Sequence, residues 1–189
     1  KARRLASSAW FQNTWGKEVV LTKDQNAKIN FENTATGFRQ VATPSNITGR
    51  RGDFVICDDL LSAKNANSEA ERERVNLWYR ESLPTRLNNP DTSSIINVMQ
   101  RLHERDVSGV ILAEELGYEH VMLPMRYEPD RVIYTSLGRV DWRTDPGELL
   151  FPERFSEETV TELERTLGPY AAASQLQQRP APREGGLFK

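Results

Sequence analysis

The chain has 189 residues, enough for one domain with a sizeable hydrophobic core, with or without tails. Its formal net charge of −2 comes from 25 basic and 27 acidic residues, so composition argues neither for nor against a nucleic-acid partner. The only cysteine is Cys57, which excludes an internal disulfide and a cysteine-based zinc site. No apolar run approaches the roughly 18 residues that a membrane-spanning helix needs, so we expect no membrane partner.

The N-terminal part predicts a helix followed by short β-strands. Large apolar side chains between residues 3 and 15 have a partly helical spacing, and Gly16 is a helix-stop signal. Residues 19–22 predict a short strand, and residues 29–43 predict an antiparallel hairpin around a turn at residues 33–37.

Two adjacent acids follow a continuous apolar run of four residues. Residues 54–57 are all apolar, and Asp58 and Asp59 come directly after them. A continuous apolar run predicts a strand buried on both faces, and open α/β sheets bind ligands beyond the carboxyl ends of such strands. This is the pattern of a Walker B strand, in which the first acid holds Mg²⁺ and the second orients or deprotonates the attacking water. The alternative is a strand that runs into an acidic turn.

A cationic loop precedes this strand. Two glycines flank Arg50 and Arg51, and such a loop can supply an arginine that neutralises a transferring phosphoryl group, in the same chain or in a neighbouring subunit. The alternative is a surface loop whose arginines form salt bridges with Asp53.

The chain then alternates helices and strands. Ser68 and Glu71 form a capping-box pattern at the start of a helix. A second buried strand is predicted at residues 95–99, a helix at residues 107–116 and a third strand at residues 119–125. This alternation predicts right-handed crossovers and a parallel sheet.

Polar residues also follow the second strand. Gln100, Arg101 and His103 are expected at the same sheet edge as the two aspartates, and Gln100 is the candidate for a residue that senses the γ-phosphate. We assign His103 a supporting or helix-capping role rather than catalysis, and we interpret His120 as a strand-end histidine. The sequence contains no Gly-x-x-x-x-Gly-Lys-Ser/Thr loop, so either the chain is no ATPase or that loop lies upstream of Lys1.

The C-terminal part predicts a capped helix that starts at Ser156, ends near Gly168 and continues helically over residues 171–176. Residues 177–186 are rich in proline and glycine and predict a linker. The order between residues 127 and 150 is not assigned, but its arginines, with Arg126, are candidates for DNA contacts.

Four segments resemble the large terminase subunit of tailed bacteriophages, namely residues 48–60, 71–79, 98–109 and 177–180. The resemblance is continuous from about Leu5 to Lys189, in the same order and spacing. It implies an α/β fold of the three-layer P-loop NTPase (RecA-like) type, with a mainly parallel sheet and an antiparallel hairpin region. It makes residues 1–176 the C-terminal part of an ATPase domain and residues 177–189 a linker towards a nuclease domain outside this chain.

The resemblance also implies a role for each candidate residue. It makes Asp58 the Mg²⁺-associated acid, Asp59 the water-activating acid and Gln100 part of the coupling strand that links hydrolysis to movement. Either Arg50 or Arg51 lies near the family's trans-acting arginine. Three features depart from the family pattern: the second acid is often Glu, the Gln100 position is often Thr, and an aromatic residue often stands at Leu102.

The implied function is ATP hydrolysis, with ATP and Mg²⁺ as cofactors, that packages viral DNA into the prohead. The implied partners are double-stranded viral DNA, the portal protein, the small terminase subunit and further copies of the chain in a ring on the prohead, in the host bacterial cytoplasm. Without the upstream phosphate loop, we expect the chain alone to bind ATP weakly or not at all.

Three alternatives remain at this point. A helicase or translocase of related fold predicts further helicase motifs and a second RecA-like domain after the linker. A non-catalytic scaffold or portal-docking module predicts that hydrolysis does not depend on Asp59. A nuclease with Asp58 and Asp59 as metal ligands needs a third carboxylate, because adjacent strand residues point in opposite directions.

Overall fold

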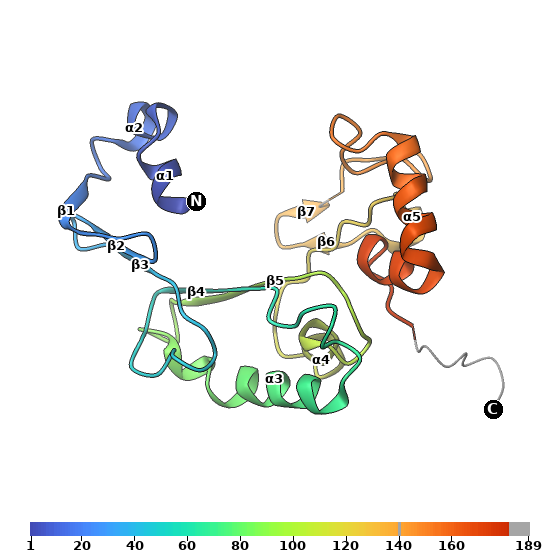
Figure 1. Ribbon diagram of the computed structural model, residues 1–189, viewed down its shortest axis with the longest axis horizontal. Helices are drawn as coiled ribbons and strands as arrows, with labels where there is room; N and C mark the ends of the chain where they lie inside the picture. The colour runs from blue at the N-terminus through green and yellow to red at the C-terminus, as the bar shows by residue number, and fades with distance from the viewer. Residues whose placement is uncertain (140, 182–189) are drawn as a thin grey trace. The chain divides into compact units, whose positions relative to one another are not determined.

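The computed structural model describes residues 1–139 and 141–181, and it divides the chain into two compact units (Figure 1). Unit 1 is Lys1–Arg50 and unit 2 is Arg51–Lys189. Both units contain helices and strands, so the α/β class predicted from the sequence is confirmed at that level.

Unit 1 begins with two short helices, α1 (Ala2–Ala6) and α2 (Ala9–Trp15), where the sequence predicted one. The break has a local cause, because Ser8 adopts an extended conformation and caps α2. Its hydroxyl accepts a hydrogen bond from the Phe11 N–H at 3.3 Å. Gly16 follows α2 as its C-cap, as predicted.

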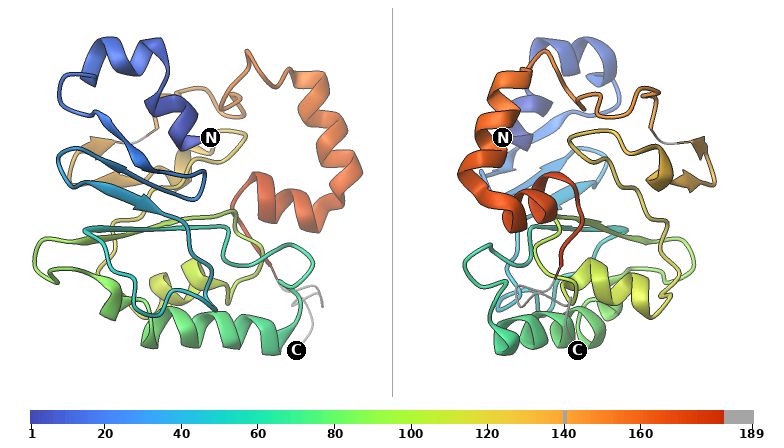
Figure 2. Two further views of the ribbon diagram at one scale, coloured as in Figure 1. Left: turned by 60° about the vertical axis from the view of Figure 1, so that its left-hand side comes forward. Right: turned by 90° about the vertical axis from the view of Figure 1, so that its right-hand side faces the viewer.

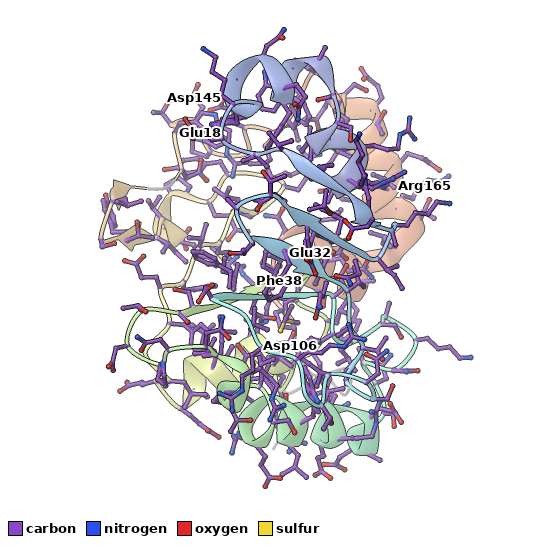
Figure 3. The ribbon with its side chains drawn as sticks, turned by 90° about the vertical axis from the view of Figure 1, so that its left-hand side faces the viewer. Glu18, Glu32, Phe38, Asp106, Asp145 and Arg165 are labelled. Atoms are coloured by element: carbon purple, nitrogen blue, oxygen red, sulfur yellow. The ribbon has the colours of Figure 1, made fainter. Side chains whose placement is uncertain are left out.

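The sheet of unit 1 is antiparallel, in the order β1 (Leu21–Asn26), β2 (Asn30–Asn33) and β3 (Phe38–Gln40). The predicted hairpin is confirmed, with Glu32 opposite Phe38 (Figure 3). Asn33 organises the turn because its side-chain Oδ1 accepts hydrogen bonds from the N–H groups of Ala35 at 3.0 Å and Gly37 at 2.8 Å.

Unit 2 is built on two parallel strands, β4 (Phe54–Asp58) and β5 (Ser94–Val98), paired in register from Phe54 with Ser94 to Asp58 with Val98. Helix α3 (Glu69–Glu81) lies in the crossover, and α4 (Val107–Ala113) follows β5. Figures 1 and 2 show α3 and α4 next to each other, on the same side of the two strands. The predicted parallel pairing of these strands is confirmed.

The prediction that these strands are buried on both faces is wrong for the described residues. Cys57 is 5% exposed, whereas Phe54 is 68% and Ile56 is 65% exposed. The side chain of Asn97, opposite Cys57 in the register, donates to Ser108 Oγ of α4 at 3.2 Å, so the helices cover the Cys57 face. Residues 1–139 and 141–181 therefore show no clear three-layer RecA-like core, because the helices cover only one face of β4 and β5.

Helix α3 begins as predicted but completes only half of the capping box. Ser68 Oγ accepts a hydrogen bond from the Glu71 N–H at 3.4 Å. The Glu71 carboxylate pairs with Arg74 at 2.8 Å, while the Ser68 N–H donates to the Asn65 carbonyl oxygen. The core of unit 2 includes Val75 and Tyr79 from this helix, together with Leu61, Leu83, Val107, Ile111 and Val160.

The predicted strand at residues 119–125 is wrong, because the backbone there is bonded to side chains and to other segments. The Met125 N–H donates to the Leu176 carbonyl oxygen at 2.8 Å. At Arg126, the side-chain amide of Gln177 accepts from the backbone N–H at 2.9 Å and donates to the carbonyl oxygen at 3.1 Å. One glutamine side chain thus occupies both backbone groups of Arg126 on one edge, while the other edge forms an isolated antiparallel bridge with Leu149.

The remaining elements of unit 2 are short apart from α5. They are η1 (Pro84–Arg86), η2 (Pro129–Arg131), the antiparallel pair β6 (Tyr134–Thr135) and β7 (Gly138–Arg139), α5 (Glu157–Ala171) and η3 (Ala172–Leu176). Ser156 caps α5 through the Thr159 N–H at 3.3 Å, as predicted. A positive φ of 73° at Gly168 interrupts α5 just before Pro169, where the sequence placed its end. In the part of the chain that is described, no helix is both long enough and apolar enough to cross a membrane.

Candidate functional site

The two candidate acids lie at the carboxyl end of β4. Asp58 is the last residue of the strand and pairs with Val98, and the Asp59 N–H donates to the Val98 carbonyl oxygen at 3.0 Å. Both aspartates are exposed. Asp59 has a φ of 45°, in the left-handed region that aspartate tolerates better than most residues, and this conformation turns the chain away from the strand.

Gln100 lies beside Asp59, as parallel pairing predicts. Its backbone N–H donates to Asp59 Oδ1 at 3.4 Å, two residues after the end of β5. The structure therefore brings Asp58, Asp59 and Gln100 to one edge of the sheet. The contact of Gln100 with the acids is made by its backbone, and the residue is exposed.

The two candidate arginines precede β4. Arg51 lies before the amino end of the strand, and β4 itself spans roughly 16 Å at the usual rise per residue. The guanidinium of Arg50 donates to the carbonyl oxygens of Asn46 at 3.2 Å and Val41 at 3.4 Å. Asp53, the predicted alternative partner, accepts a hydrogen bond from Asn88 Nδ2 at 3.1 Å. Within unit 2, Arg51 and the two acids thus belong to opposite ends of β4.

The acid pair fits the way proteins hold Mg²⁺ in nucleotide sites. This ion takes one or two carboxylates and completes its shell with phosphate oxygens and water, so Asp58 can supply a ligand without a larger cluster. Among residues 1–139 and 141–181 there is no group of three or more His, Cys, Asp or Glu side chains placed to hold a metal. The nuclease alternative, which needs a third carboxylate, therefore gains no support from these residues.

The loop after β5 is organised by Asp106, to which sequence reasoning gave no role. Asp106 is fully buried and caps α4, and its carboxylate accepts hydrogen bonds from the Gly109 N–H at 2.8 Å and the Leu102 N–H at 2.9 Å (Figure 3). It also accepts from the His103 N–H at 3.2 Å and from Arg101 Nε at 2.9 Å. Its sequence signal was an aspartate immediately before an apolar helical run.

Arg101 is bound on its backbone as well as its side chain. Its N–H donates to Gln178 Oε1 at 3.0 Å, and its carbonyl oxygen accepts from Ser174 Oγ at 3.0 Å. Ser174 is 2% exposed. Gln178 and Ser174 are separated from Arg101 by more than 70 positions, and no local pattern in the sequence indicated their contact with it.

The two histidines have structural surroundings. His103 Nδ1 accepts a hydrogen bond from the Arg105 N–H at 3.0 Å, and burial, followed by the positive charge of Arg72, lowers the pKa of His103. Both observations fit a neutral imidazole that supports the loop. Burial, then Arg101 and Arg131, lowers the pKa of His120, which lies outside any strand, so its interpretation as a strand-end residue is wrong.

Two of the arginines considered for DNA contacts, Arg126 and Arg131, bind partners within unit 2. Arg126 pairs with Glu157 at 2.7 Å and Glu164 at 2.8 Å, and hydrogen bonds with Glu157 and then Glu164 raise its pKa. Arg131 pairs with Glu128 at 2.8 Å. These cations are held by carboxylates, so they give no support to DNA contacts.

Arg143 is also held internally. Its side chain is fully buried and pairs with Asp141 at 2.7 Å. It donates to the carbonyl oxygens of Pro124 at 2.8 Å, Met125 at 3.1 Å and Glu148 at 2.8 Å. Arg143 is therefore a structural residue of unit 2. The side chain of Arg139, the remaining candidate, lies outside the described part.

The start of the predicted linker has specific contacts. Gln177 and Gln178 bind the backbone of Arg126 and Arg101, and Arg179 pairs with Glu128. Residues 182–189 of the linker lie outside the described residues. The boundary at residue 177 stays a prediction.

Comparison with known proteins supplies no assignment. No model of a known protein family matches the chain, and a search of curated proteins finds no match either.

Proposed function

We propose that this chain is part of an ATP-hydrolysing motor that moves double-stranded DNA, namely the ATPase part of a phage terminase large subunit that packages viral DNA into the prohead. The resemblance of four ordered segments supports the proposal. The observation that carries it is the meeting of Asp58, Asp59 and Gln100 at the carboxyl ends of two parallel strands, with the Gln100 N–H on Asp59.

In this proposal Asp58, Asp59 and Gln100 have different roles. Asp58 would hold Mg²⁺ together with the phosphates of ATP, and the ion would supply charge neutralisation of those phosphates. Asp59 Oδ1 is held by the Gln100 N–H, which leaves Oδ2 to orient a water molecule and accept its proton. A movement of Asp59 is passed directly to the Gln100 backbone, which is the coupling role that the resemblance assigns to this position.

Two parts of the proposal come from outside this edge. The phosphate-cradling loop is absent from the sequence, so the proposal requires that a segment outside residues 1–189 supplies it. A neighbouring subunit supplies Arg50 or Arg51, because Arg51 precedes the opposite end of β4 from the acids of its own chain. The three-layer RecA-like fold belongs to the same proposal, and its second helix layer would cover the exposed face of Phe54 and Ile56.

The test is DNA-stimulated ATP hydrolysis by the complete protein that carries this chain. Asp59→Asn is nearly isosteric but a poor base, and we expect it to lower the rate about 100-fold or more. The matched control is Asp53→Asn, which changes an exposed acid just before the amino end of β4 and is expected to leave the rate within about twofold. An Asp59→Asn rate equal to wild type would refute the proposal and favour the scaffold or nuclease alternatives.

A further inference from the structure

The C-terminal segment after α5 binds the backbone of the loop between β5 and α4. Arg101 is the residue after Gln100, and both of its backbone polar groups are bonded to residues that follow α5. The N–H donates to Gln178 Oε1 and the carbonyl oxygen accepts from Ser174 Oγ, each at 3.0 Å. Both contacts are partly buried, so water competes weakly for them.

Asp106 also binds this loop. This buried carboxylate binds the Arg101 guanidinium and the next two backbone N–H groups, those of Leu102 and His103. Asp106 does not bind the backbone of Gln100 or Arg101. Asp106 and Ser174 thus both bind the Arg101–Leu102 peptide group, whereas the contact on the Gln100–Arg101 peptide group is made by Gln178.

We propose that Gln178, assisted by Ser174, is a positioning residue that holds the Gln100 N–H against Asp59. A shift at Arg101 moves Gln100, since the two residues share a peptide bond. The Gln100–Asp59 hydrogen bond is already long at 3.4 Å, so a small further shift would break it. The segment after α5 thus sets the geometry of the water-orienting acid. This inference rests on the proposed ATP hydrolysis for its catalytic consequence, but not for the contact itself.

Gln177 provides a matched control because it is the adjacent residue with the same side chain. Its amide pairs with the backbone of Arg126 and with Glu128, and it does not bind the loop after β5. Gln177→Leu therefore makes the same side-chain change but removes hydrogen bonds to a different segment. The Gln178 amide also donates to the Gln175 carbonyl oxygen at 2.8 Å. Gln178→Glu loses that donor but keeps an oxygen acceptor for the Arg101 N–H, whereas Gln178→Leu loses both.

The experiment combines two measurements on the complete protein. Hydrogen–deuterium exchange of a peptide covering residues 97–102 reports the backbone contact, and steady-state kinetics reports ATP hydrolysis. We expect Gln178→Leu to speed exchange in this peptide about tenfold and to lower kcat about tenfold with KM unchanged. Gln178→Glu and Gln177→Leu are expected to stay within about twofold of wild type in both measurements. Ser174→Ala removes one hydrogen bond with little change in volume and is expected to act in the same direction as Gln178→Leu.

Each outcome decides a separate point. Unchanged exchange in Gln178→Leu would overturn the proposal, and faster exchange with unchanged kcat would overturn the positioning role. A kcat equally low in Gln177→Leu and Gln178→Leu would show a general structural effect and also overturn it. A wild-type protein that does not hydrolyse ATP would refute the proposed function, while the exchange result would still decide whether Gln178 holds the backbone after β5.

Discussion

Replacing Asp106 is predicted to destabilise unit 2 more than any surface substitution near the candidate site. The residue is fully buried, and its carboxylate pairs with Arg101, whose side chain is only 14% exposed. Asp106→Ala removes the acceptor of the Arg101 guanidinium and of three backbone N–H groups, those of Leu102, His103 and Gly109.

The magnitude follows from two overlapping effects. Removing one partner of a buried ion pair costs about 3–5 kcal/mol, since the other charge is left without compensation. Loss of a helix N-cap costs about 1 kcal/mol. The same carboxylate serves both roles, so the losses do not add, and we expect Asp106→Ala to lower the free energy of unfolding by about 4 kcal/mol.

Urea unfolding followed by circular dichroism measures this change, with linear extrapolation to water. The control is Glu104→Ala in the same loop, because Glu104 is exposed and we expect a change within about 0.5 kcal/mol. A loss below about 1 kcal/mol for Asp106→Ala, or equal losses for both variants, would refute the view that this carboxylate organises the loop after β5.

Two further predictions concern buried groups of unit 2. Arg143→Lys replaces a guanidinium that binds Asp141 and three carbonyl oxygens with a single ammonium. We expect this change to lower the free energy of unfolding by about 3 kcal/mol, measured by thermal unfolding. The exposed Arg165→Lys should change little, and equal effects would contradict the structural role of Arg143. Burial raises the pKa of the Cys57 thiol to about 11, above the roughly 8.5 of an unfolded chain. The folded state therefore holds this proton more tightly, so the contribution of Cys57 to stability is complete below about pH 8.5 and is lost as the pH rises towards 11. Urea unfolding of wild type and Cys57→Ala across this range measures the difference, and parallel pH profiles would refute the raised pKa.

Local and periodic signals predicted the parts of the fold that they control. The apolar run before Asp58 and the similar run before Gln100 predicted two parallel strands whose carboxyl ends meet, because parallel strands share one direction. Ser68 and Ser156 capped their helices as expected, since a cap depends on residues within one turn.

Contacts between distant residues were beyond the reach of these signals. The segment at residues 119–125 has strand-like composition, but Gln177 binds one edge of the backbone at Arg126, and the other edge pairs only through an isolated antiparallel bridge with Leu149. The role of Gln178 at Arg101 was missed for the same reason. Pro124, which cannot donate a backbone hydrogen bond, was the one local feature that argued against a strand.

The proposed role of Asp59 is to act on water while other groups bind the nucleotide. Equilibrium binding of ATP in the presence of Mg²⁺ and single-turnover hydrolysis, both measured on Asp59→Asn in the complete protein, test it most directly. We predict an ATP dissociation constant within about threefold of wild type and a single-turnover rate lower by about 100-fold or more. Hydrolysis at the wild-type rate by a variant that still binds ATP would contradict a water-activating role for Asp59.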